Sequence, residues 1–185
     1  MRVIAGKARS MPLRTVKGMD VRPTTDRTKE TLFNILMPWI PGCRFLDLYA
    51  GSGSIGIEAL SRGASSAVFV EKDRKTQELI LENLEFTKLL EGATLIRGDV
   101  NSVLGRLGSE KFDVIFLDPP FDHGLEKETL EILSGLDILE EDGLIVVEAS
   151  PKTDFSYLDD LGFEKFKERR YGMSQHIFLK KRRDL

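Results

Sequence analysis

"FLDLYAGSGSIGIEAL", residues 45–60, decides the fold of this chain. An apolar run typical of a buried strand leads into Gly51, Gly53 and Gly56, which have the GxGxxG spacing, and an apolar helix-like run follows. Glycines allow a tight turn and let a ligand approach the backbone, while the first turn of a helix presents N–H groups without helical partners. The stretch therefore predicts a strand, a ligand-binding loop and a helix in direct succession.

The segments around this stretch continue the same alternation. Strand-like apolar runs lie at 44–49, 67–71, 93–97, 112–117 and 144–148, and helix-like stretches lie at 54–62, 73–90, 100–107 and 125–135. Near-continuous apolar strands separated by helices are typical of a parallel sheet that is covered on both faces. The last two extended runs, "FEKFKERRYG" and "SQHIFLKK", predict an antiparallel hairpin at the sheet edge.

The front of the chain has a different character. Its first 24 residues are basic and punctuated by Gly and Pro, which predicts a small β extension rather than a core strand. Thr24 or Thr25 can cap the helix that follows, whose apolar face contains Leu32, Phe33, Ile35 and Leu36. We therefore divide the chain into a basic extension, residues 1–24, and an α/β domain, residues 25–185.

Length and composition indicate one globular domain. The chain has 185 residues, and its single cysteine, Cys43, excludes an intrachain disulfide and is typical of a reducing compartment. No apolar run approaches the ~20 residues that span a bilayer, and the N-terminus lacks the apolar core of a secretory signal. We expect a cytoplasmic protein without a membrane segment.

The net charge of −3 hides a strong asymmetry. Residues 1–29 carry eight basic and two acidic side chains, a net charge of +6, and residues 164–185 carry eight and three, a net charge of +5. The middle of the chain carries the remaining 11 basic and 25 acidic residues, a net charge of −14. Basic ends favour an anionic partner, although two solvated tails would give the same pattern.

Two acids suggest which nucleotide the glycine loop binds. Glu71 lies 20 residues after Gly51, at the predicted end of the next strand, where a carboxylate can accept hydrogen bonds from ribose hydroxyls. Asp47 precedes the loop and would repel a pyrophosphate, whereas it would attract the ammonium and sulfonium groups of S-adenosylmethionine. Asp99 could accept a proton from the adenine amino group, or it could simply cap the helix at 100–107.

The fourth strand ends in "FLDPPF", residues 116–121, which suggests the acceptor. An exocyclic amine on a base is a poor nucleophile because its lone pair is delocalised into the ring. Asp118 and the Pro119 carbonyl could accept both of its N–H groups, and Phe121 offers a face for base stacking. Pro119 and Pro120 fix the backbone and provide no competing N–H. The pattern therefore predicts an N-methyltransferase that gains its rate mainly from orientation.

"LDLYAGSGSIGIEALSRGA" together with "FLDPPF" resembles the Rossmann-like, class I S-adenosylmethionine-dependent methyltransferases. The N-terminal "MRVIAGKARSMPLRTVKGMDVRPTTDRTKETLFNIL" is similar to the RsmD family, bacterial enzymes that methylate guanine N2 in 16S rRNA. The resemblance implies a seven-stranded, mostly parallel sheet with an antiparallel C-terminal hairpin and a small N-terminal β extension. It also implies the clamp Asp118, Pro119, Pro120 and Phe121. The predicted cofactor contacts are Asp47, Tyr49, Gly51, Ser52, Gly53, Glu71, Lys72, Asp99 and Val100.

The substrate that the resemblance implies is a guanine of 16S rRNA, of the guanine 966 type, in naked RNA or in an assembling small subunit. Such a base must leave its stack to reach a recessed clamp. The basic extension would then bind phosphates, and the predicted RNA contacts are Arg2, Lys7, Arg9, Arg14, Arg22 and Arg27. We expect a monomer that requires no metal.

Three alternatives share parts of this pattern. An adenine-N6 DNA methyltransferase has the same clamp, but this chain has no additional target-recognition domain. A methyltransferase of protein glutamine or of a small molecule often carries Asn in place of Asp118 and has less use for two basic ends. A non-catalytic RNA- or NAD-binding protein would not require Asp47 or an intact DPPF. His123 is expected in a solvated loop, and His176 is expected to be structural.

Overall fold

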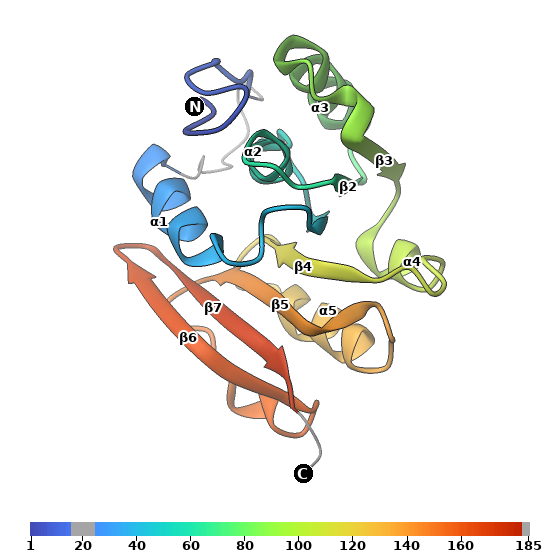
Figure 1. Ribbon diagram of the computed structural model, residues 1–185. Helices are drawn as coiled ribbons and strands as arrows, with labels where there is room; N and C mark the ends of the chain where they lie inside the picture. The colour runs from blue at the N-terminus through green and yellow to red at the C-terminus, as the bar shows by residue number, and fades with distance from the viewer. Residues whose placement is uncertain (16–24, 183–185) are drawn as a thin grey trace.

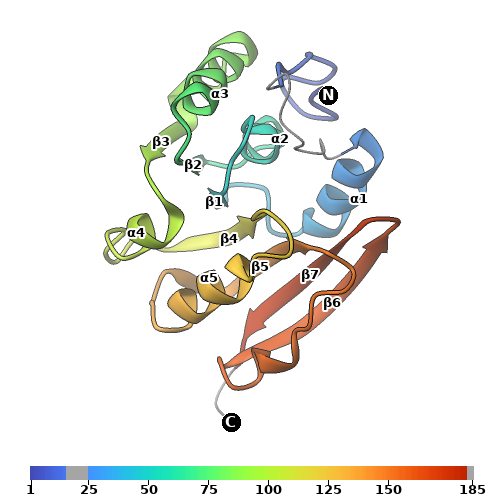
Figure 2. The ribbon, with the colours of Figure 1, turned by 180° about the vertical axis from the view of Figure 1, so that it is seen from behind.

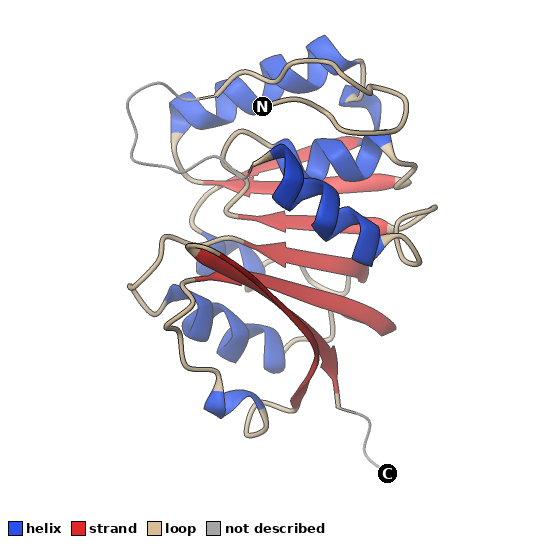
Figure 3. Cartoon of the chain, turned by 90° about the vertical axis from the view of Figure 1, so that its left-hand side faces the viewer, coloured by secondary structure: helices blue, strands red, loops and turns tan. Residues whose placement is uncertain are grey.

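The computed structural model describes residues 1–15 and 25–182. They form three layers, with a seven-stranded sheet between two groups of helices (Figure 1, Figure 3). The strand order is β3-β2-β1-β4-β5-β7-β6. The strands are β1 Arg44–Leu48, β2 Ser66–Glu71, β3 Ala93–Arg97, β4 Phe112–Leu117, β5 Leu139–Ala149, β6 Phe163–Tyr171 and β7 Ser174–Lys181.

The first five strands are parallel, and the last two form the predicted hairpin. β7 pairs antiparallel with both β5 and β6, and the two strands form a long twisted ribbon at the sheet edge (Figure 2). The α/β class, the mostly parallel seven-stranded sheet and the antiparallel C-terminal hairpin are therefore confirmed. Because β1 to β5 run in the same direction, their carboxyl ends meet at one edge, which we call the carboxyl edge.

The helices cover both faces of the sheet. α1 Asp26–Leu36, α2 Ser54–Ser61 and α3 Arg74–Thr87 pack on one face, and α4 Val100–Leu104 and α5 Leu125–Ser134 pack on the other (Figure 1). Two short 3₁₀ helices lie at Leu90–Gly92 and Ser156–Leu158. Each face has its own buried apolar cluster, as expected for parallel strands that are buried on both sides. In the described part of the chain, no helix combines the length and apolarity that crossing a membrane requires.

Three predicted boundaries were wrong, each for a local reason. The helix predicted over 73–90 ends at Thr87, because Lys88 follows at its C-cap with a left-handed φ of 59°. The helix predicted over 100–107 ends at Leu104 and is followed by Gly105, a residue with low helix propensity. The strand predicted over 144–148 begins at Leu139, and the three polar residues at 140–142 are exposed. An exposed polar start to a strand produces no apolar run, so the pattern revealed only the buried part.

The N-terminal extension forms a tight loop with an isolated antiparallel bridge between Arg2 and Pro12. Val3, Ala8 and Leu13 are buried and belong to the same apolar cluster as α1 and α2. The tip of the loop lies against the end of α2, where the Lys7 N–H donates to the Ser61 carbonyl over 2.8 Å. A side chain on Gly6 would place its Cβ 1.8 Å from that carbonyl oxygen. Residues 1–15 therefore pack as part of the core.

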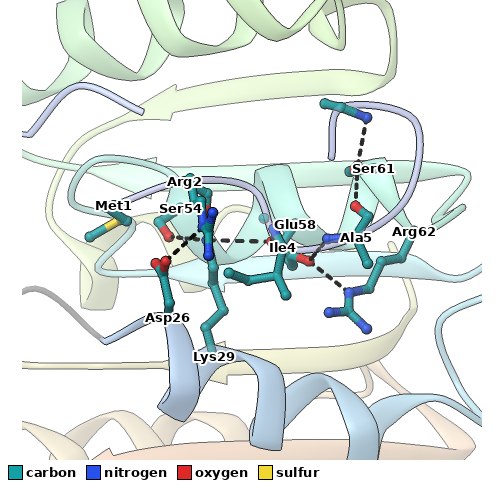
Figure 4. Close-up of polar contacts among 12 residues, drawn as sticks. Met1, Arg2, Ile4, Ala5, Asp26, Lys29, Ser54, Glu58, Ser61 and Arg62 are labelled. Atoms are coloured by element: carbon teal, nitrogen blue, oxygen red, sulfur yellow. Dashed lines mark hydrogen bonds and ion pairs between the residues drawn. The ribbon is translucent and has the colours of Figure 1, made fainter. Parts of the chain in front are cut away.

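A buried ion pair fixes this extension to the two helices below it (Figure 4). Lys29 of α1 is fully buried, and its Nζ lies 3.3 Å from Glu58 Oε2 of α2 and 2.6 Å from the Arg2 carbonyl oxygen. Glu58 also accepts hydrogen bonds from the N–H groups of Ile4 and Ala5, at 2.8 and 3.0 Å. Burial is the main cause that lowers the pKa of Lys29, and the Glu58 charge opposes it.

Candidate cofactor and acceptor site

The glycine loop lies at the carboxyl edge, between β1 and α2. Gly51 and Gly53 adopt left-handed φ angles of +54° and +76°, a conformation that glycine reaches without strain. A Cβ on Gly51 would meet only one atom, the Tyr49 carbonyl oxygen at 4.0 Å, so the loop is open on that side. A Cβ on Gly56 would lie 2.3 Å from the Phe69 ring. Gly51 therefore leaves space for a ligand, whereas Gly56 allows α2 to pack against the sheet.

Two acids hold this loop in place. Asp47 is buried at the end of β1, and its Oδ2 accepts a hydrogen bond from the Gly56 N–H over 2.9 Å. Burial raises the pKa of Asp47 to about 8, while the Gly56 bond opposes the shift. Glu71, at the end of β2, accepts from the Gly51 N–H at 3.0 Å and from the Asp73 N–H at 2.8 Å. Each Glu71 oxygen keeps a lone pair for a ribose hydroxyl, so these residues fit an adenosine cofactor.

The other predicted cofactor contacts lie around the same edge in different roles. Asp99 caps α4, because its Oδ1 accepts from the N–H groups of Asn101 and Ser102, as the alternative interpretation proposed. Val100 is buried in the first turn of α4, and Lys72 is exposed after β2. Tyr49 has a positive φ of 61°, and its hydroxyl lies 2.8 Å from Thr129 Oγ1 of α5. Burial raises the pKa of the Tyr49 hydroxyl.

The neighbouring backbone joins this loop to the N-terminal extension. The Asn83 amide of α3 donates to the carbonyls of Ser52 and Arg14, at 2.9 and 3.0 Å, and accepts from the Arg14 N–H at 2.9 Å. Ser52 Oγ lies 3.9 Å from the Met1 sulfur. The two ends of the N-terminal loop therefore lie beside the glycine loop, while its tip lies at the opposite end of α2.

The predicted clamp follows β4 at the carboxyl edge. β4 pairs with β1, with Leu117 opposite Leu48, so the clamp begins directly beside the glycine loop. Pro119 is buried, Asp118 and Phe121 are partly exposed, and Pro120 is exposed. Asp122 then takes a left-handed φ of 63°, which turns the chain toward α5. The fold thus brings the two sequence motifs, 70 residues apart, to neighbouring strand ends.

The surroundings of Asp118 favour its protonated form. Its pKa is raised well above the ordinary aspartate value, first by burial and then by the charges of Glu148 and Asp47. Carboxyl groups with strongly raised pKa values concentrate at functional sites, although structural networks produce them too. The carboxyl edge therefore contains a group of acids, drawn from β1, β4 and β5, that is unusual for a purely structural sheet end.

Sequence reasoning overlooked Glu148, the acid one residue before the end of β5. It is 6% exposed, and its Oε2 lies 3.0 Å from His176 Nε2 of β7. The sequence did contain a signal for Glu148. The apolar run "LIVVE" ends in an acid, as does "FLD", and both acids lie at the carboxyl edge. Lys29 and Glu58 were also missed, although each stands on the apolar face of its helix. His123 is exposed in the loop after the clamp, as expected, and His176 is fully buried.

The predicted RNA contacts are distributed over the N-terminal region. Arg2 and Arg14 lie near the glycine loop and pair with Asp26 at 2.9 Å and with Glu82 at 2.7 Å. Lys7 and Arg9 are exposed at the tip of the N-terminal loop, and Arg27 is exposed on α1. Arg22 lies outside the described residues. Among the residues that the structure describes, no group of three or more His, Cys, Asp or Glu side chains could hold a metal ion.

Known proteins resemble this chain over its whole length. The family model described as "Conserved hypothetical protein 95" matches residues 1–180. The YlbH protein of Bacillus subtilis strain 168 is 38% identical over 185 residues, covering 98% of this chain and 100% of its own. The "Ribosomal RNA small subunit methyltransferase D" of Escherichia coli K12 is 39% identical over 149 residues, covering 80% of this chain and 74% of its own.

The fold agrees with these sequence matches. The solved structure of the yhhF protein of Escherichia coli superposes with a TM-score of 0.84 and 33% identity, covering 100% of this chain and 99% of that one. The chain therefore belongs to the conserved hypothetical protein 95 family, which is the RsmD family of class I methyltransferases.

Proposed function

We propose that this protein transfers a methyl group from S-adenosylmethionine to the exocyclic N2 of a guanine in 16S rRNA. The name of the Escherichia coli relative, a small-subunit rRNA methyltransferase, supports the substrate class. The choice of guanine N2, and of the position numbered 966, extends beyond that name. We further propose that the protein is a monomer that acts in the cytoplasm and needs no metal. Its substrate would be either naked RNA or an assembling small subunit.

One observation carries the proposal, namely the position of Asp118 and Pro119 at the strand end beside the glycine loop. When bound there, S-adenosylmethionine would supply an electrophilic methyl group. Asp118 and the Pro119 carbonyl would accept both N–H groups of the amine and thereby orient its lone pair. Phe121, which is partly exposed, would stack on the base.

The cofactor proposal depends on the residues of the loop. The open side of Gly51 and the carboxylate of Glu71 suit an adenosine, and the buried acid Asp47 leaves no favourable place for a pyrophosphate. The remaining predicted contacts, Tyr49, Ser52, Gly53, Lys72, Asp99 and Val100, lie along the same edge. Asp99 contributes there as a helix cap, which fixes the first turn of α4 at this edge.

A transfer assay with tritium-labelled S-adenosylmethionine tests the function. The acceptors are 16S rRNA without proteins, assembled small subunits that lack the modification, and double-stranded DNA. We expect label in one of the two ribosomal forms and none in DNA, with mass-spectrometric mapping of the label to N2 of one guanine. Label in adenine N6 of DNA would support the DNA methyltransferase alternative. Cofactor binding without transfer to any acceptor would contradict both.

A further inference from the structure

A row of polar side chains crosses the sheet directly beside the proposed clamp. Leu117 of β4 pairs with Val147 of β5 in parallel register, so the residues that follow, Asp118 and Glu148, are neighbours. Glu148 is itself paired with His176 of β7. Because adjacent strands lie about 4.8 Å apart, the three polar residues occupy consecutive positions along the carboxyl edge.

These three side chains lie on the same face of the sheet. Side chains alternate along a strand, so residues two positions apart share a face. The residues two positions from Asp118, Glu148 and His176 all belong to the apolar cluster under α1, α2 and α3: Phe116, Val146 and Phe178. The His176 ring also packs edge-on against Phe116, with centroids 6.2 Å apart. The row therefore faces the side of the sheet on which the glycine-loop helix packs.

The environment of His176 indicates where its proton lies. Nε2 contacts Glu148 at 3.0 Å, whereas Nδ1 is buried without a hydrogen-bond partner among the described residues. Aromatic rings enclose the imidazole, namely Phe116, Tyr171 and Phe178. A proton on Nδ1 would have no acceptor, while a proton on Nε2 is bonded to Glu148. We therefore assign the Nε2 proton to the hydrogen bond with Glu148, a carboxylate that has no lysine or arginine partner among the described residues.

We propose that Glu148, held in place by His176, is a positioning residue whose charge makes Asp118 a strong proton acceptor. This inference rests on the proposed function. An amine nitrogen that gains a carbon must lose a proton. The new N–C bond would form as the C–S bond of bound S-adenosylmethionine breaks, with that electron pair leaving on sulfur. The electrons of the broken N–H bond remain on nitrogen, and Asp118 takes the proton as its carboxylate becomes a carboxylic acid. His176 acts through Glu148, because it prevents that carboxylate from rotating away.

The electrostatics agree with this geometry. After burial, the charge of Glu148 is the largest cause that raises the pKa of Asp118, and Asp47 contributes less. Within the described ranges, these acids are the charged groups that act on Asp118, from β5 and β1, and His176 and Tyr171 border Glu148 from β7 and β6. A neighbouring negative charge disfavours ionisation and so strengthens the affinity of Asp118 for a proton.

Glu148→Gln tests the proposal, since glutamine keeps the size of the side chain and an oxygen that can accept from His176. We expect the acidic limb of the kcat–pH profile to move to lower pH by about one unit, because Asp118 loses a negative neighbour. Cofactor affinity should stay unchanged. Glu164→Gln, which removes the same charge from an exposed position of β6, should leave the profile unchanged. An unshifted profile for Glu148→Gln would overturn the proposal.

A direct titration separates this inference from the proposed function. ¹³C NMR of the aspartate carboxyl groups, with Asp118→Asn to identify the resonance, measures the ionisation of Asp118 without RNA. We expect a titration well above the ordinary aspartate range in the native protein, and a lower one in Glu148→Gln. Titration in the ordinary range would overturn the inference even if Glu148→Gln did not fold. If no acceptor is methylated, the proposed function fails, while this measurement still decides the coupling.

Discussion

Two sets of carboxylates lie on the same side of the sheet and differ in what surrounds them. Glu58 accepts two backbone N–H groups and pairs with Lys29 and Arg62, at 3.3 and 2.7 Å. Asp118 and Glu148, at the carboxyl edge, form no ion pair with a lysine or arginine among the described residues, and the imidazole of His176 is the partner of Glu148. Cations surround the first carboxylate, whereas burial and neighbouring acids favour the protonated form of Asp118.

This difference separates a structural acid from a functional one. A buried carboxylate that has cations and N–H donors holds elements together, and removal of one partner leaves the other charge uncompensated. Carboxylates crowded together without cations reduce stability, and such sites persist where the charge has a use. We infer that the Glu58 network fixes the N-terminal extension, whereas the edge acids are kept for a ligand that brings hydrogen-bond donors or positive charge.

The largest expected effect comes from the clamp. Asp118→Ala should lower turnover by three to four orders of magnitude, about 4–5.5 kcal/mol, because the amine loses its acceptor and its orientation. Cofactor affinity should change little, since Asp118 lies on the acceptor side of the site. Single-turnover methyl transfer and cofactor titration by calorimetry measure the two quantities separately. Equal losses in both would mean that Asp118 binds the cofactor, contrary to its assigned role.

Asp47→Asn tests how much the buried acid Asp47 lowers the free energy of unfolding. The folded pKa of Asp47, about 8, exceeds the unfolded value of 3.8, so the unfolded chain binds fewer protons between these values and stability falls as pH rises. Asparagine keeps the acceptor for the Gly56 N–H and removes this dependence. We expect the variant and the native protein to be equally stable near pH 4, and the variant to be more stable by about 4 kcal/mol at pH 8.

Urea denaturation across that pH range measures this difference. Asp113→Asn is the matched control, because Asp113 also accepts a backbone N–H, from Arg44 at 2.7 Å, but near the more exposed start of β4. The control shows the effect of losing a carboxylate that accepts a backbone N–H but is only partly buried. A difference between Asp47→Asn and the native protein that stays constant from pH 4 to 8 would show that folding does not raise the pKa of Asp47.

Lys29→Met tests the carboxylate that cations surround. Removal of the cation leaves Glu58 buried with fewer partners, which should lower the free energy of unfolding by about 3 kcal/mol, with Arg62 still supporting the carboxylate. The amides of Ile4 and Ala5 should exchange faster, because the N-terminal extension depends on this network. Lys111→Met, which breaks the exposed pair with Asp137, is the control and should cause no measurable change. Unaltered amide exchange at Ile4 would show that the N-terminal extension does not depend on the Lys29–Glu58 ion pair.

The sequence predicted the acids of the carboxyl edge better than it predicted the buried pairs of charged and polar side chains. Strand ends followed by glycine, proline and acid stand out in a pattern, so Asp47, Glu71 and Asp118 could be named from sequence alone. Lys29 and Glu58 are 29 residues apart, and Glu148 and His176 are 28 apart, and only the folded chain brings each pair together. A buried charge within an apolar face signals that a partner exists, but it does not identify the partner. The first residues of β5 were missed for a different reason, because exposed polar strand residues produce no apolar pattern.

The smallest expected effect concerns the basic extension, where the structure divides the predicted RNA contacts. Arg14 lies beside the glycine loop and pairs with the exposed Glu82, while Arg9 lies at the far tip without an ion pair to another described residue. Exposed pairs are weak, so a phosphate can displace Glu82 from Arg14. Replacing both arginines by glutamine should weaken RNA binding about tenfold and reduce the slope of log K against log salt by about 1 to 2.

The single variants sharpen this test, because the two arginines lie at opposite ends of α2. If RNA follows the whole extension to the carboxyl edge, Arg9→Gln and Arg14→Gln should each reduce the salt slope by about 0.7 to 0.9. If RNA contacts only the edge, Arg14→Gln alone should change it. Lys111→Gln removes an equal charge outside the extension and should leave the slope unchanged. Filter binding at four salt concentrations distinguishes these outcomes. Equal slopes for all variants would show that the extension does not contact RNA. Even then the buried contacts of Val3, Ala8 and Leu13 would explain why residues 1–15 are ordered, since packing against α1 and α2 does not require a nucleic acid.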